Sequence, residues 1–252
     1  MTVEPSWRLL IALVLLIALA VGASTWGRFG QGKATVFAAL RAIVQLGVVS
    51  LVIVACLQNM WLALLFTLLM YGIGVRTTTQ RTGVGQAWPW TALAMISGVL
   101  PVLGIIFATG VAPFNGYSVI PLAGIVVGNM MTAHTLFGRR QFAALRENIP
   151  TYEAALLIGL DRSSSIKLVT EATAKEALVP NLDQTRTVGL VTLPGAFIGV
   201  LLGGGTALQA GATQVLVLIG IMAGQNVTVA VANRLMCQAR LLPADLKERL
   251  RP

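Results

Sequence analysis

Residues 82–138 read TGVGQAWPWTALAMISGVLPVLGIIFATGVAPFNGYSVIPLAGIVVGNMMTAHTLFG, without one Asp, Glu, Lys or Arg. This stretch is too long for one bilayer crossing of about 20 residues and suits two. Its middle carries Pro113-Phe114-Asn115-Gly116, a combination of residues that is typical of a tight turn. The stretch therefore predicts a helical hairpin in a membrane.

Two further stretches, 42–75 and 187–233, also lack charged residues and are each long enough for two crossings. Turn-forming residues interrupt them at 57–59 and at 203–211. With one helix before them, the pattern predicts an all-α polytopic membrane helix bundle of about seven transmembrane helices. The expected spans are 9–26, 36–57, 60–75, 91–111, 117–137, 187–203 and 213–236.

The composition supports a membrane protein and excludes an ordinary soluble domain. Hydrophobic residues make up 56% of the chain and charged residues 11%, against about a quarter in soluble domains. All of the 18 Lys and Arg except Arg8 fall at the hairpin ends on one side. By the positive-inside rule this predicts an outside N-terminus, an inside C-terminus and a place in the inner or plasma membrane. The net charge of +9 therefore needs no nucleic acid partner.

The one long polar stretch is 139–186, which we interpret as a cytoplasmic insert in a single transmembrane domain of residues 1–252. It predicts two or three short helices. Thr151 is the expected N-cap of the first, Asp161 begins the second and Pro180 ends it. One face of the second helix is apolar or small, at Ile166, Val169, Thr173 and Ala177.

Within this insert, Glu153-Ala154-Ala155 and Gly159 fit the start of the motif by which ABC transporter permeases contact their ATPase. The Leu-Pro expected later in the full motif is absent. An amphipathic insert of this kind is expected to dock on a partner. The alternative is a solvated loop with balanced charge.

The chain carries no complete nucleotide motif. Gly27, Gly32 and Lys33 have the spacing of a phosphate-binding loop, but Ala34 stands where a Ser or Thr must hold magnesium. We therefore expect no cofactor, and no binding or hydrolysis of ATP by the chain alone. If transport uses ATP, a separate subunit must bind it.

Polar residues within the spans are candidates for a translocation path. The only histidine, His134, lies one turn after Met130, and the two could meet a soft metal ion. The alternative is a neutral histidine packed inside the bundle. Gln45 and Asn129 either line a path or join helices. The expected spans hold no Asp or Glu, which disfavours a proton- or sodium-coupled carrier.

Three separated segments resemble a known family. They are Arg41-Ala42-Ile43-Val44-Gln45-Leu46, the stretch Ile120–Met131 with its Pro121, Gly124, Gly128 and Asn129, and Ala177–Asp183 followed by Thr187–Gly195. Together they resemble the FetB/YbbM-type ABC transporter permeases, which include bacterial iron exporters and the plant aluminium-tolerance permease. The resemblance covers roughly residues 36–236.

This resemblance implies a permease subunit that forms a homodimer in membrane lipid, pairs with a cytoplasmic ABC ATPase and exports a metal ion such as iron. It adds Pro194 and Gly195 to the candidate path. Ala196-Phe197 departs from the Met-Met that many members carry there, so a metal role at that point is not expected here. The alternatives are an ABC permease for another small solute, such as a nucleotide-sugar, and an ATPase-independent channel or carrier.

Overall fold

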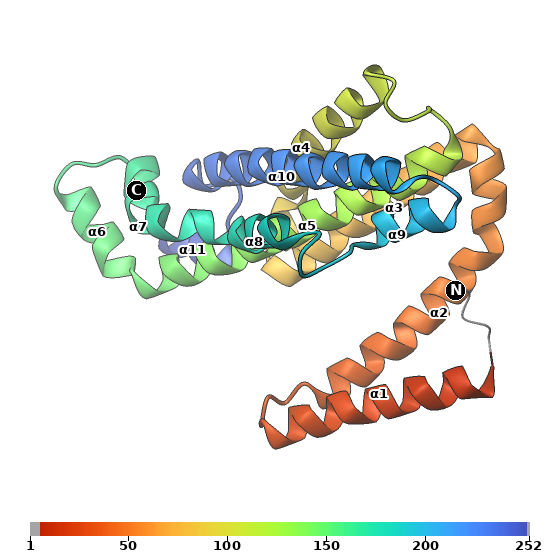
Figure 1. Cartoon of the computed structure of the whole chain (residues 1–252). Coiled ribbons are helices and arrows are strands. Elements are labelled where there is room, and N and C mark those ends of the chain that lie inside the picture. The colour runs from red at the N-terminus through yellow and green to blue at the C-terminus, as the bar shows by residue number, and fades with distance from the viewer. Residues whose placement is uncertain (1–5, 251–252) are drawn as a thin grey trace. The chain divides into compact units, whose positions relative to one another are not determined.

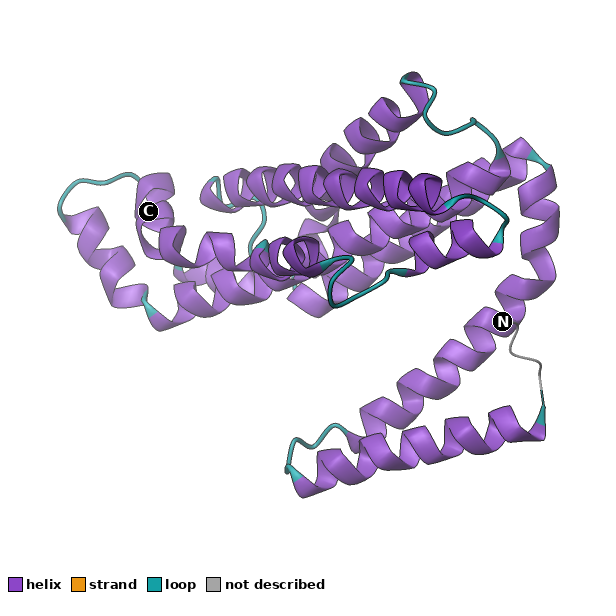
Figure 2. Cartoon of the chain, viewed as in Figure 1, coloured by secondary structure: helices purple, strands orange, loops and turns teal. Residues whose placement is uncertain are grey.

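The computed structural model describes residues 6–250, and among them every regular element is a helix (Figures 1 and 2). Contacts divide the chain into one unit that ends at Gln58 and a larger one that begins at Asn59. Six helices among the described residues are long and apolar enough to cross a membrane. The prediction of a polytopic helical membrane protein is confirmed. The orientation and the number of crossings stay predictions.

The first unit is a helical hairpin of α1 (Trp7–Trp26) and α2 (Gly32–Gln58). The loop between them is tied back to α1, because the Gln31 backbone N–H donates to Ser24 Oγ at 3.1 Å. Nearly all the apolar side chains of both helices are exposed. Such surfaces are stable where lipid is the solvent.

Four long helices form the frame of the second unit. They are α3 (Met60–Thr82), α4 (Trp88–Ala108, after the short 3-10 helix η1 at Gly85–Ala87), α5 (Gly116–Glu147) and α10 (Ala207–Cys237). Helices α4 and α5 both pack against α10, and α3 packs mainly against α5. This frame holds most of the buried apolar side chains.

The expected turns coincide with capped helix starts. The Asn59 side chain accepts hydrogen bonds from the first turn of α3, and the Asn115 side chain accepts one from Ser118 N at 3.0 Å. At the start of α10, Thr206 and Gln209 form a reciprocal capping box. These bonds satisfy backbone N–H groups that a helix start leaves without partners. The predicted breaks at 57–59 and 113–116 are therefore confirmed, whereas the third covers only 203–206, because α10 already begins at Ala207.

The insert differs in detail from the expectation. Helix α5 continues to Glu147, well past residue 139, and α6 (Ile149–Leu157) begins after Asn148, so Thr151 is inside a helix rather than at its cap. Asp161 does cap α7 (Arg162–Ala174), accepting from the N–H groups of Ser163 and Ser164. The short 3-10 helix η2 (Lys175–Ala177) follows. Pro180 begins α8 (Val179–Thr187) instead of ending α7, because a proline is tolerated in a first turn, which needs no N–H.

The expected helix over 187–203 is wrong. Helix α9 covers only Gly195–Leu202, which is about 12 Å of helix against a hydrocarbon core of about 30 Å. Residues 188–194 are not helical: Gly189 has a φ of 81°, and its N–H donates to the Thr192 carbonyl at 2.9 Å in a closed turn. Pro194 then stands just before α9, where its missing N–H costs nothing.

The last helix in the described part of the chain is α11 (Ala244–Arg249), and Arg146 joins it to the charged end of α5. The Arg146 guanidinium donates to both carboxylate oxygens of Asp245, at 2.7 and 3.1 Å. This bonding holds the pKa of the Asp245 carboxyl below its ordinary value. A depressed carboxyl pKa means that the ion pair stabilises the fold at neutral pH and that this contribution is lost in acid.

We expect Asp245→Asn to lower stability at pH 7 by less than about 1 kcal/mol, because both partners are nearly half exposed and water screens the pair. Glu248→Gln, a neighbouring exposed acid outside this pair, is the matched control. Thermal melting in detergent at pH 7 and near pH 2, well below the ordinary pKa of a carboxyl group, checks the prediction. A difference between wild type and Asp245→Asn that is as large near pH 2 as at pH 7 would contradict it.

Candidate functional site

A tight three-helix junction lies in the middle of α4, α5 and α10. Gly98 of α4 faces Gly224 of α10, and a Cβ on Gly224 would stand only 3.1 Å from the Gly98 carbonyl oxygen. The same Cβ would lie 3.0 Å from Sδ of Met130, which α5 contributes. Met130 is fully buried. Two glycines thus let two backbones approach each other, and one flexible thioether fills the remaining space.

His134 lies one turn beyond this junction. Helices α5 and α10 run in the same direction, since their first halves line one cavity and Gln225 Nε2 donates to the Asn129 carbonyl at 3.3 Å. One turn beyond Met130 and Gly224, the two helices therefore bring His134 and Thr228 to the same level. Both side chains are 0% exposed.

The polar atoms at this level lack hydrogen-bond partners. Within residues 6–250, neither ring nitrogen of His134 has a partner, nor do the hydroxyls of Thr228 and of Thr91, which lies two turns before Gly98 on α4. A buried polar group without a partner is costly, by roughly 1–3 kcal/mol for each group. Such a group is rarely retained without a reason in the molecule's function or in bound solvent.

The donor set of this junction is neutral: an imidazole, a thioether and hydroxyls. Imidazole and thioether are ligands that soft and borderline transition metals accept. No cluster of three or more His, Cys, Asp or Glu side chains exists in the described part of the chain. The junction therefore lacks the anionic ligands of a tight metal centre, and its chemistry suits weak, passing contact with a cation or a small polar solute.

Asn129 belongs to the same junction but in a different role. Its side-chain amide donates to the Ile125 carbonyl of its own helix at 2.9 Å, while its backbone carbonyl accepts from Gln225. Gln45 belongs to α2, in the first unit, and is exposed. The structure thus groups Asn129, Met130 and His134 and adds Thr228, which no sequence pattern distinguishes from the other threonines.

The second feature of the site is a segment broken into two short helices. Helix α7 and the following η2 pack against the charged second half of α5, and α10 begins at Ala207 at the opposite end. Between these points the chain runs the length of the bundle through α8, the non-helical stretch 188–194 and α9 (Figure 2). Helices α8 and α9 both contact α10.

The non-helical stretch is exposed and largely apolar. Leu190 and Val191 are 90% and 77% exposed. Pro194 and Gly195, both candidate path residues, stand at the point where the chain becomes helical again. In a membrane, non-helical backbone is tolerated only where protein covers it or where it lines a water-filled space. Discontinuous helices of this kind form binding sites in many transporters.

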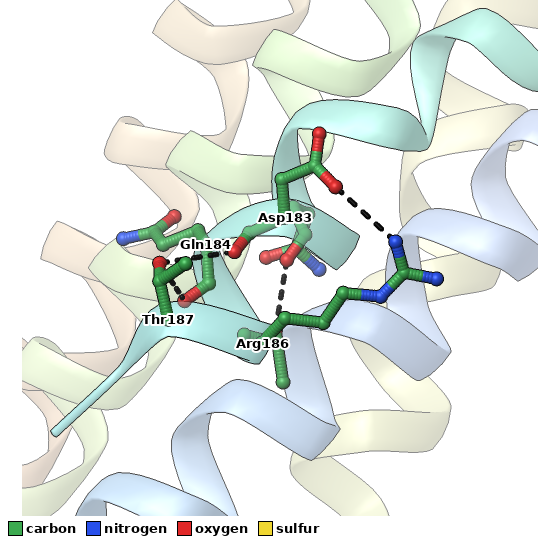
Figure 3. Close-up of polar contacts among 6 residues, drawn as sticks. Asp183, Gln184, Arg186 and Thr187 are labelled. Atoms are coloured by element: carbon green, nitrogen blue, oxygen red, sulfur yellow. Dashed lines mark hydrogen bonds and ion pairs between the residues drawn. The ribbon is translucent and has the colours of Figure 1, made fainter. Parts of the chain in front are cut away.

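The last turn of α8 carries charge just before the helix ends. Arg186 Nη1 donates to Asp183 Oδ1 at 3.4 Å, and the Thr187 hydroxyl donates to the carbonyl of Asp183 at 3.0 Å (Figure 3). Both charged side chains are mostly exposed. The two opposite charges neutralise each other, so the last turn of α8 carries no net charge just before the uncharged stretch begins.

At the end of the bundle away from the basic residues, a cavity of about 730 Å³ lies between the starts of α5 and α10 and the short helix α9. Ser118, Gln209 and Thr213 give it polar atoms, and Gly199 of α9 forms part of its wall. Pro121 also lines it and cannot donate to the carbonyl four residues earlier. The cavity therefore lies directly beside the second helix of the broken segment.

The proposed ATPase-contact segment forms the tip of the α6–α7 hairpin. Glu153 and Ala154 are exposed, but Ala155 is buried in the protein's own fold. Gly159 has a φ of 91°, which favours glycine. The tip presents Leu157 and Ile158, which are 88% and 79% exposed. These two apolar side chains, which sequence reasoning missed, are the most accessible part of the segment.

Comparison with known proteins places these features in a family. The model of UPF0014, described as an uncharacterised protein family, matches residues 7–241. The chain belongs to the UPF0014 family. The resemblance inferred from the three sequence segments is therefore confirmed at the level of the family.

Named relatives of the UPF0014 family align over nearly their whole length. The UPF0014 membrane protein slr1647 of Synechocystis is 28% identical over 91% of this chain and 92% of its own. Protein ALUMINUM SENSITIVE 3 of Arabidopsis thaliana is 26% identical over 90% and 84%. The probable iron export permease protein FetB of Escherichia coli is 24% identical over 87% and 86%. No solved structure matches the chain.

Proposed function

We propose that this chain is the permease subunit of an ABC transporter in the cell membrane and that it exports a metal ion such as iron. The observation that carries the proposal is the interrupted segment of α8, 188–194 and α9, both helices of which contact α10. Helix α10 also carries Thr228, whose buried hydroxyl has no partner within residues 6–250. The name of the Escherichia coli relative supports export of iron. The neutral His134 and Met130 donors are compatible with a transition metal in transit.

The energy source in this proposal is a separate cytoplasmic ATPase. The phosphate-loop spacing at 27–33 does not fit a nucleotide site, because it follows the apolar helix α1 instead of a strand and has Ala34 where a Ser or Thr must hold magnesium. The ATPase would dock on the α6–α7 tip, where Leu157 and Ile158 would enter an apolar groove. A second copy of the chain would complete the transporter, because ABC transporters need two membrane halves.

The docking proposal is tested with Leu157→Ser combined with Ile158→Ser. Truncation of two apolar anchors at the centre of an interface is expected to weaken ATPase retention roughly tenfold. Both side chains are exposed, so the fold should be kept. The partner P-loop ATPase is followed by co-purification from the native membrane and by its ATP turnover.

The matched control is Leu168→Ser, an exposed leucine on α7 of the same hairpin. Full ATPase retention by the double variant would overturn docking at this tip. Absence of any P-loop ATPase from the wild-type preparation would overturn the ABC assignment itself and favour an ATPase-independent channel or carrier.

A further inference from the structure

Two cavities flank the turn at residues 83–87, which connects α3 to α4. One, of about 430 Å³, is an almost wholly apolar groove that Tyr71, Val75, Trp88 and Ala92 line. The other, of about 200 Å³, is more polar than apolar. Gly85 lines both, and a Cβ added there would meet nothing within 4 Å. The rim between the cavities is therefore open.

The polar cavity concentrates positive charge. Arg240 and Lys247 line it, and the Arg240 guanidinium lies 5.0 Å from the centre of the Trp90 ring. The three ion pairs in the described part of the chain include neither residue. Stacking on Trp90 holds one cation in place, and the charge of both remains available for an anion.

The apolar groove lies beside the polar cavity and presents aromatic and aliphatic surface in place of charge. The Tyr71 hydroxyl donates to the Ala92 carbonyl at 2.6 Å, so its polar tip is satisfied and its ring adds to the apolar lining. Trp88 is 58% exposed at the rim, as expected of an aromatic residue at a membrane–water interface. Arg76, also on this groove, is absent from the same ion pairs.

We propose that the two cavities together bind one anionic phospholipid of the cytoplasmic leaflet, with its phosphate between Arg240 and Lys247 and an acyl chain along the Tyr71–Trp88 groove. Adjacent cationic and apolar surfaces match the two parts of such a lipid. The site lies at the end of the bundle that the Lys and Arg distribution predicts to be cytoplasmic. At 200 Å³ the polar cavity is smaller than the roughly 300 Å³ of pockets for drug-sized molecules, which favours a headgroup over a nucleotide.

The test measures lipid binding to the full-length protein in neutral detergent by native mass spectrometry, with phosphatidylglycerol and phosphatidylcholine as probes. Wild type should retain phosphatidylglycerol at least tenfold more strongly than phosphatidylcholine. Arg240→Gln should reduce this preference at least fivefold. Arg249→Gln, which removes an exposed cation of α11 outside the cavity, should leave the preference unchanged.

A second variant keeps the proposal falsifiable if Arg240→Gln perturbs the fold. Gly85→Leu places a side chain over the open rim without a clash and should reduce phosphatidylglycerol retention by a similar factor. Equal retention by wild type, Arg240→Gln and Gly85→Leu would overturn the site. Displacement of the lipid by millimolar inorganic phosphate, without dependence on Gly85, would show a simple anion site and overturn the lipid assignment.

Discussion

Gly98→Ala is expected to destabilise the helix bundle by at least about 3 kcal/mol, the upper end of the usual cost of overpacking. The added methyl would overlap the backbone carbonyl oxygen of Gly224 and the hydroxyl of Thr228, and it would stand 3.1 Å from Met130 Sδ. A backbone carbonyl cannot turn aside as a side chain can. Helices α4 and α10 must therefore separate to admit the methyl group.

The measurement is the thermal melting temperature in detergent, together with the yield of monodisperse protein. Gly104→Ala is the matched control on the same helix, because a Cβ at Gly104 would meet nothing within 4 Å. That change should be neutral or slightly stabilising, since alanine favours a helix by about 1 kcal/mol over glycine. Equal melting of Gly98→Ala and Gly104→Ala would contradict the close approach of α4 and α10.

His134→Leu is expected to abolish metal export while leaving the fold intact. Leucine fills a similar space, and it removes a buried polar ring whose nitrogens have no partner among residues 6–250. Replacing such a group by an apolar one is nearly neutral or stabilising. Transport should fall more than tenfold, because the junction loses its only nitrogen ligand in a neutral donor set.

This prediction separates the two interpretations of His134, as a path residue and as a packed neutral histidine. ATP-dependent uptake of Fe²⁺ into inverted membrane vesicles measures transport, and melting in detergent measures stability. Thr135→Val is the control, because it removes another buried, unpartnered hydroxyl from the neighbouring position of α5 and should leave transport unchanged. Full transport by His134→Leu would assign this residue to packing alone.

Much of the fold could be predicted because a helix that crosses lipid must meet simple requirements of length and charge. A crossing helix needs about 20 apolar residues, and charge must lie outside it, so the uncharged stretches located the long helices. Asn59, Asn115 and Asp161 marked helix starts because their side chains satisfy N–H groups that a first turn leaves free. The apolar face of the insert was likewise visible, and Ile166 and Ala177 are buried as expected.

The wrong prediction of one continuous helix over 187–203 also has a physical cause. Absence of charge and apolar length indicate where a chain can enter a membrane, but they do not require a helix there. Gly189 and Pro194 were local signals of a break, and Gly189 does adopt a conformation that favours glycine. The predicted span followed the apolar length of the stretch and not these two residues. Whether such backbone is tolerated depends on what surrounds it, which is a property of the assembled bundle.

The sequence by itself determined that this protein is a bundle of membrane helices, where most of them begin and end, and which family it belongs to, because local patterns and lipid decide these properties. Only the tertiary structure brought Gly98 of α4 against Gly224 of α10 and set Met130 between them. It also left His134, Thr91 and Thr228 without hydrogen-bond partners among residues 6–250. Contacts between helices that are far apart in sequence depend on the register of each against the others, and no local pattern in one chain specifies that register.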